Sequence, residues 1–190
     1  MLWGRVIRSP HPHATILSVD TSKVESQLLR GAILTPFNVG NGYVAPDIPI
    51  LDTKVRFVGD EVGAIAADSE FESAKALSLI DVKYDILPFS LSTDHAMSGD
   101  SEPIHPGGNL VNSAPIIEQR GNILEGFDQA DVIVERFFST PGHASAALEP
   151  RSVLSSWEGN HLTVWKSSRG VHVDKANIAA SLNISLNNIT

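Results

Sequence analysis

Cysteine is absent from this 190-residue chain. Its absence excludes disulfides, thiolate nucleophiles, zinc sites built on cysteine, and iron–sulfur clusters held by this chain. If the protein takes part in redox chemistry, we therefore expect its electron carriers to lie in another domain or subunit.

Basic residues and long apolar runs are also scarce. The chain has 14 Lys+Arg against 22 Asp+Glu, which gives a formal net charge of -8. No stretch gathers lysine and arginine into the stripe that phosphate neutralisation requires, so we expect no nucleic-acid partner. The N-terminus has no apolar signal core, and no later stretch is long and uncharged enough to cross a bilayer. We therefore expect a soluble cytoplasmic protein with no membrane span.

The first half of the chain alternates strand and helix signals. The spacing of Ser22 with Glu25 and of Ser69 with Glu72 fits two capping boxes, each of which predicts the start of a helix. Gly31 stands where the first helix would end in a left-handed residue. Strand-like composition recurs at residues 2–8, 14–20, 31–35, 55–58, 61–67 and 81–85.

The second helix has apolar residues at helical spacing. Phe71, Leu77 and Ile80 recur behind Ser69 and predict a core-facing side. Residues 38–49 are rich in Gly, Pro, Asn and Asp, which predicts an exposed loop. These elements predict an α+β domain over residues 1–88. A long irregular connector is expected over residues 89–121 because prolines and glycines interrupt it.

A second domain is expected to begin at residue 122. Residues 130–140 have strand composition, and residues 151–157 and 162–166 predict a hairpin with a turn longer than two residues. Residues 171–182 predict a helix, with Val173, Ala176 and Ala180 on its packed face. Another strand is due at the chain end. We therefore interpret residues 122–190 as the incomplete start of an α+β domain.

Several sequence segments resemble those of one family, the large subunits of molybdenum hydroxylases such as xanthine dehydrogenase, aldehyde oxidase and 4-hydroxybenzoyl-CoA reductase. The opening Gly4-Arg5-Val6-Ile7-Arg8-Ser9-Pro10-His11-Pro12-His13-Ala14, residues 56–67 and residues 74–88 resemble the first domain of that subunit, the α/β hammerhead. Residues 143–150, with Leu148-Glu149-Pro150, and residues 157–165 resemble the start of the molybdopterin-binding domain.

The resemblance implies a molybdenum-dependent oxidoreductase that acts on an aldehyde, an aromatic heterocycle or an aromatic acyl-CoA. Its cofactor would be molybdopterin, in the cytosine dinucleotide form, and its partners would be iron–sulfur and FAD subunits or domains. The family's glycine-rich cofactor loop and catalytic glutamate would both lie beyond Thr190. We therefore expect no catalytic residue within this chain, no cofactor bound to it alone, and no activity from it alone.

The resemblance also assigns site residues. Lys166-Ser167-Ser168-Arg169-Gly170 is similar to a segment in which many relatives carry a glutamine that hydrogen-bonds near the molybdenum oxo group, and here that position holds Arg169. Arginine is a permanent cation with donors only, whereas the glutamine amide is neutral and can also accept a hydrogen bond. Arg169 therefore either favours an anionic substrate or marks a departure from ordinary hydroxylase chemistry, and a surface salt bridge is the structural alternative. The resemblance places His143 and Glu149 in the wall of a substrate funnel.

Other polar groups have a structural and a functional interpretation. His11 and His13 are a candidate metal pair, but no third ligand is in view, so we favour histidines that bond to the backbone and expect no metal site. His143 and Glu149 are a candidate acid–base pair. The adjacent carboxylates Asp60-Glu61 would point to opposite faces of a strand, which favours a solvated turn. The glycines near residues 40–42 and 107–108 indicate flexible loops rather than phosphate loops.

Three hypotheses remain open. The first is a fragment of a molybdenum hydroxylase large subunit. The second is a stand-alone hammerhead module that serves subunit assembly without catalysis. The third is a small hydrolase that uses His143 and Glu149. A partial second domain would expose apolar surface, so we also expect the isolated chain to form homo-oligomers.

Overall fold

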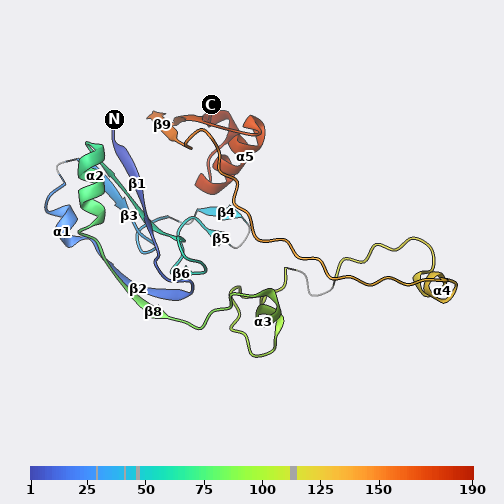
Figure 1. The fold of residues 1–190 in the computed structure, drawn as a ribbon. Helices are drawn as coiled ribbons and strands as arrows, with labels where there is room; N and C mark the ends of the chain where they lie inside the picture. Colours follow the sequence, from blue (N-terminus) through green and yellow to red (C-terminus); the bar gives the residue numbers. More distant parts are fainter. Residues whose placement is uncertain (29, 41, 46–47, 112–114) are drawn as a thin grey trace. The chain divides into compact units, whose positions relative to one another are not determined.

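The computed structural model describes residues 1–28, 30–40, 42–45, 48–111 and 115–190. The chain divides into two units (Figure 1). The first unit contains residues 1–109 and 152–190, and the second contains residues 110–151. Strands and helices are mixed in the first unit, which confirms the predicted α+β class.

The first unit contains an antiparallel sheet in the order β1-β7-β3. Strands β1 (Trp3–Arg8) and β3 (Gly31–Leu34) pair with the two edges of β7 (Glu61–Ala67). Helix α2 (Glu70–Leu77) follows β7 directly and lies along this sheet (Figure 1). The central strand β7 is largely buried, as its apolar composition predicted.

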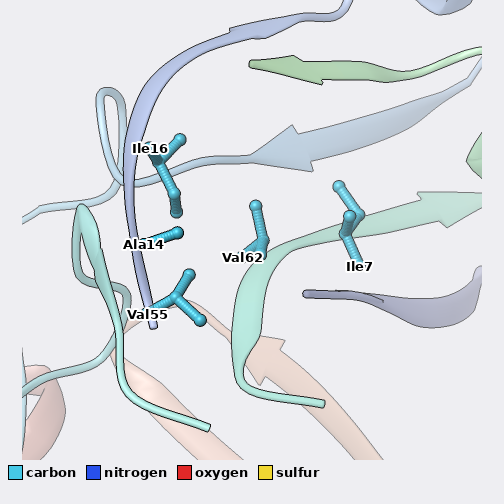
Figure 2. Packing of buried hydrophobic residues seen from close by; sticks show 5 residues of the cluster. All are labelled: Ile7, Ala14, Ile16, Val55 and Val62. Carbon is cyan, nitrogen blue, oxygen red and sulfur yellow. The ribbon is translucent and has the colours of Figure 1, made fainter. Parts of the chain in front are cut away.

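A second antiparallel sheet has the order β6-β2-β8. It consists of β6 (Lys54–Val55), β2 (Ala14–Asp20) and β8 (Asp81–Ile86). Residues 56–58 were predicted to continue β6, but they form a turn closed by Asp60. The two sheets share one apolar cluster (Figure 2), made of Ile7, Ala14, Ile16, Val55 and Val62.

A smaller cluster joins α2 to helix α1 (Ser22–Glu25) through Val24, Ile65 and Ala76. The predicted capping box at Ser22 is wrong, because the N-cap is Thr21 and makes no side-chain cap bond. Asp20 instead accepts the Ser22 amide at 3.0 Å. The helix ends at Glu25, so Gly31 begins β3 rather than closing the helix, and Leu29 lies outside the described residues.

The N-terminus of α2 is capped as predicted. The Ser69 hydroxyl accepts the Glu72 amide at 3.1 Å. The packed face differs from the prediction, however, because Phe71 is 77% exposed while Ser73 and Ala76 are buried. Leu77 and Ile80 do pack against the core. Phe71 lies in the first turn on the side that faces away from the sheet, which the periodicity alone did not reveal.

We expect Ser69→Ala to destabilise the protein by about 1 kcal/mol, because the Glu72 amide at the start of α2 would lose its acceptor. Urea unfolding followed by circular dichroism measures this loss. Ser22→Ala is the matched control, since Ser22 caps no helix by its side chain, and it should cost clearly less. Equal losses in the two variants would contradict the assignment of the cap.

Residues 38–49 were expected to be an exposed loop, but they contain two short strands. These are β4 (Tyr43–Ala45) and β5 (Ile48–Pro49), which pair with each other. Asn41 and residues 46–47 of this stretch lie outside the described residues. The strands are too short for sequence periodicity to reveal them.

The expected connector is partly ordered. Residues 93–97 form helix α3 (Thr93–Met97), which Ser92 caps through the His95 amide. The side-chain amide of Asn109 then ties the following turns together. It donates to the carbonyls of Ala96 and Glu102 at 2.9 and 3.2 Å and accepts the Ile104 amide at 2.8 Å. This order comes from polar bonds, so a search for apolar periodicity missed it. Residues 112–114 of the connector lie outside the described residues.

The second unit contains helix α4 (Ile123–Asp128), which the sequence did not predict and which Asn122 caps. The strand predicted at residues 130–140 is wrong, because this segment has no ladder partner within its unit. Strand propensity yields a strand only where a neighbouring strand supplies hydrogen bonds.

The C-terminal part of the first unit contains the predicted hairpin and helix. Strand β9 (Val153–Glu158) pairs with β10 (His161–Lys166), and the turn has two residues rather than the longer loop expected. Gly159 has a φ of 58° there, as a tight hairpin turn requires. Helix α5 (Val171–Leu182) has the predicted bounds. Its buried residue is Ala179, however, and Val173, Ala176 and Ala180 are exposed.

The chain end forms an isolated bridge rather than the strand expected there. After a short 3-10 helix, η1 (Leu186–Asn188), Ile189 forms this parallel bridge with Leu162. The amide of Thr190 donates to the Leu162 carbonyl at 2.9 Å, and the Val164 amide donates to the Thr190 carbonyl at 2.8 Å. Leu162, Ala179 and Ile189 form a third apolar cluster.

Candidate functional site

The candidate site is the loop of residues 167–170, which joins β10 to α5. The loop follows the carboxyl end of β10 and leads into the N-terminus of α5, and an isolated parallel bridge of Ile189 with Leu162 brings the chain after α5 back beside β10. Ligands commonly bind where the carboxyl end of a strand leads into a helix N-terminus. The fold therefore places the predicted residue Arg169 in a position suited to ligand contact.

The loop is held at both ends by polar contacts. Lys166, the last residue of β10, pairs with Asp174 in the first turn of α5 at 2.7 Å. Within the loop, the Gly170 amide donates to the Ser168 hydroxyl at 3.0 Å, and the Asp174 amide donates to the Gly170 carbonyl at 3.0 Å. Hydrogen bonds from Lys166 and then Ser168 lower the pKa of the Asp174 carboxyl.

Arg169 itself is exposed, and within the described part of the chain no ion pair or hydrogen bond engages its guanidinium. The surface salt bridge considered as its alternative role is therefore not formed among those residues. Gly170, the N-cap of α5, has no side chain to cap the helix. The loop thus presents one uncompensated cation beside uncapped amide groups, an arrangement that favours an anionic ligand.

His143 and Glu149 both lie in the second unit, in a stretch without helix or strand. Both side chains are exposed, and the described hydrogen bonds include none between them. The geometry thus gives no support to the acid–base pair. Their place in a substrate funnel stays a prediction.

The histidines near the N-terminus have structural roles. His13 is fully buried, and its Nδ1 donates to the Pro88 carbonyl at 2.6 Å, while its own carbonyl accepts the Leu87 amide at 3.0 Å. His11 packs edge-to-face on Tyr84 with ring centroids 4.8 Å apart. Burial raises the pKa of the Tyr84 hydroxyl. The ring of His13 thus bonds to the backbone, as the favoured alternative expected, whereas the ring of His11 packs on Tyr84 instead. The described residues contain no group of three or more metal-ligating side chains.

Asp60 closes the turn that precedes β7, as predicted for a turn, whereas Glu61 is the first residue of β7. Asp60 accepts the Arg56 amide at 2.8 Å and the Glu61 amide at 3.0 Å, while Glu61 pairs with Arg8 at 2.9 Å. Their carboxylates are thus engaged with different partners.

Among the described residues, no helix is long and apolar enough to cross a membrane.

Sequence reasoning did not identify Lys166 and Asp174 as functional residues. They are eight positions apart on different elements, so neither helical nor strand spacing relates them. The only available signal was their position on either side of the segment that contains Arg169.

Comparison with known proteins defines the class of this fold. Residues 1–88 match the model of the aldehyde oxidase and xanthine dehydrogenase a/b hammerhead domain. Residues 104–190 match the model of the molybdopterin cofactor-binding domain. The family resemblance predicted this arrangement, in which a hammerhead domain is followed by the start of a molybdopterin-binding domain.

Individual relatives agree with these matches. The chain is 35% identical over 154 residues to a probable xanthine dehydrogenase component of Bacillus subtilis, covering 78% of this chain and 20% of that protein. It is 33% identical over 190 residues to the nicotinate dehydrogenase large molybdopterin subunit of Eubacterium barkeri, covering 96% of this chain and 44% of that protein. The chain therefore spans less than half the length of these relatives. It belongs to the family of molybdenum hydroxylase large subunits.

Solved structures share the fold. The aldehyde oxidoreductase of Desulfovibrio gigas superimposes with a TM-score of 0.84 at 24% identity, over 100% of this chain and 22% of that one. Quinoline 2-oxidoreductase of Pseudomonas putida 86 gives a TM-score of 0.80 at 21% identity, over 100% of this chain and 26% of that one.

Proposed function

We propose that this chain forms the hammerhead domain and the first part of the cofactor domain in the large subunit of a molybdenum-dependent oxidoreductase. The observation that carries the proposal is the order of the two family matches along one chain. The substrate would be an aldehyde, an aromatic heterocycle or an aromatic acyl-CoA. Partners would be iron–sulfur and FAD subunits or domains of a cytoplasmic enzyme, which agrees with the absence of cysteine.

The residues at the site fit an anionic cofactor or substrate. Arg169 is uncompensated among the described residues, and the N-terminus of α5 beside it lacks a side-chain cap. Molybdopterin, in the cytosine dinucleotide form, carries phosphate groups and would supply the redox chemistry at its metal. Arg169 would hold an anionic oxygen of the bound substrate or cofactor by charge-assisted hydrogen bonds. Because arginine cannot accept a hydrogen bond, it would orient that oxygen without taking a proton from it.

Under this proposal, the chemical step depends on residues elsewhere in the complete protein. None of the residues proposed here acts as nucleophile or general base, so the 190-residue chain alone would be inactive and would bind no cofactor stably. His143 and Glu149 would contribute to the wall of the substrate funnel. The domains would span residues 1–88 and 122–190, with residues 89–121 as the connector.

Molybdenum analysis tests the proposal. We expect the complete gene product, co-expressed with the subunits encoded beside it, to contain stoichiometric molybdenum by plasma mass spectrometry. The 190-residue chain prepared in the same host should contain essentially none. Reading the native gene past Thr190 adds an independent check, because a cofactor-loop sequence should follow. A stop codon there would contradict the proposal.

The alternative is a non-catalytic hammerhead module that serves subunit assembly. The feature that favours it is the polar segment of residues 92–109, which hydrogen bonds of Asn109 hold together and which contributes no residue to the buried apolar clusters. A stable complex without molybdenum would support this alternative. Hydrolysis of ester or amide substrates by the isolated chain, lost in His143→Ala, would instead support a hydrolase.

A further inference from the structure

We propose that the ion pair between Lys166 and Asp174 is a positioning device, which fixes the loop of residues 167–170 and thereby the direction of Arg169. This inference rests on the proposed function of Arg169. The two side chains come from the two elements that the loop connects, and their Nζ and Oδ2 atoms lie 2.7 Å apart. The contact thus closes a ring that runs from residue 166 to residue 174 around the loop.

Arg169 depends on this ring because its own side chain has no other anchor among the described residues. Its guanidinium donates to no carboxylate or carbonyl there, so among the described residues only the backbone, through the position of Cα and the direction of the Cα–Cβ bond, limits where the guanidinium can lie. Ser168 and Gly170, on either side of Arg169, are bonded to each other at 3.0 Å. Arginine has a long, flexible side chain. A fixed backbone at its base lowers the conformational entropy that is lost when this side chain binds a ligand.

The pair also sets the charge of the loop. Lys166 is about one-third exposed, with 35% of its side chain accessible, and Asp174 neutralises it. The loop therefore offers a single uncompensated cation, Arg169, rather than two. A site with one such cation favours an anionic substrate over its neutral analogue.

Surface ion pairs add little to global stability, so the effect should be local. In the 190-residue chain, Lys166→Met and Asp174→Asn should each speed amide hydrogen exchange at residues 167–173 by about two- to fivefold, without changing exchange in β7. The exchanged variant K166D/D174K, which restores an ion pair across the loop, should return most of the protection. Asp85→Asn is the control for net charge, because Asp85 is exposed on β8 and should change nothing in the loop.

In the complete enzyme, the double variant K166M/D174N breaks the ion pair without changing the net charge. It should raise the KM for an aromatic substrate that carries a carboxylate more than the KM for its uncharged amide analogue, because only the carboxylate would be held by Arg169. Unchanged exchange in both single variants, or no recovery in the exchanged variant, would overturn the positioning role. Equal changes of KM for the two compounds would overturn the specificity role. If the complete enzyme lacks molybdenum, the proposed function fails, whereas the exchange result on the isolated chain still decides whether the pair fixes the loop.

Discussion

Gly63→Ala is expected to lower the stability of the first unit by about 1–3 kcal/mol, because a methyl group there has no space. Gly63 is buried in the central strand β7. A Cβ atom at this position would lie 2.5 Å from the Leu34 carbonyl oxygen of β3 and 3.0 Å from Ile7 Cδ1 of β1. Either β3 must shift or the ladder must open. Calorimetry should show a fall of about 2–12 °C in Tm.

The same sheet supplies the control. Gly4 lies in β1, and the nearest atom to its added Cβ would be the Ile65 carbonyl oxygen at 4.0 Å. Gly4→Ala should therefore leave Tm unchanged or raise it slightly, since alanine restricts the unfolded chain more than glycine. A loss as large as that of Gly63→Ala would show that any side chain in this sheet is harmful, and would contradict the close-approach argument.

Arg169→Gln in the complete enzyme should reduce kcat/KM for an aromatic substrate that carries a carboxylate by about 10- to 100-fold, because one charge-assisted hydrogen bond to that carboxylate would be lost. The value for the uncharged amide analogue should change much less, and glutamine is the side chain that the family resemblance implies at this position. Thermal stability should hardly change, since Arg169 is exposed and contacts no described carboxylate. Steady-state kinetics with both compounds, alongside molybdenum content and Tm, measure these effects.

Arg30→Gln is a suitable control for the loss of positive charge. Arg30 is exposed and its only described ion pair, with Asp68, is 3.6 Å long. It should leave both kinetic values unchanged. Unaltered kinetics with a lowered Tm in Arg169→Gln would show a structural role, and would remove Arg169 from the proposed site.

Local signals in the sequence predicted local structure well. The Ser69–Glu72 cap and the bounds of α5 follow from contacts within a few residues. Such contacts form in the same way whatever the chain packs against. The α+β class followed from these elements, and the resemblance added the family.

Packing partners were not predictable in the same way. Phe71 has an apolar side chain at helical spacing, yet only the position of the sheet decides that Ala76 is buried and Phe71 is not. Residues 130–140 have strand composition but find no ladder within their unit. The periodicity of apolar residues shows that a segment has two different faces. The rest of the fold decides which face is buried.

At the candidate site, too, the sequence indicated one residue and the structure revealed the others. Arg169 was located through the resemblance, because no spacing distinguishes an exposed arginine in a loop from any other. Lys166 and Asp174 required the structure, since their contact arises only when α5 turns back beside β10. Tertiary geometry therefore supplied the part of the site that holds the loop.

The segment tied together by Asn109 has a thermodynamic consequence. Its order comes from amide and hydroxyl bonds, and none of its residues belongs to a buried apolar cluster. Opening it exposes little apolar surface, so its opening should carry a small heat-capacity change and a weak dependence on urea concentration. It would loosen gradually on warming while the two three-stranded sheets remain folded. Temperature, rather than denaturant, would then govern how freely this part of the protein opens.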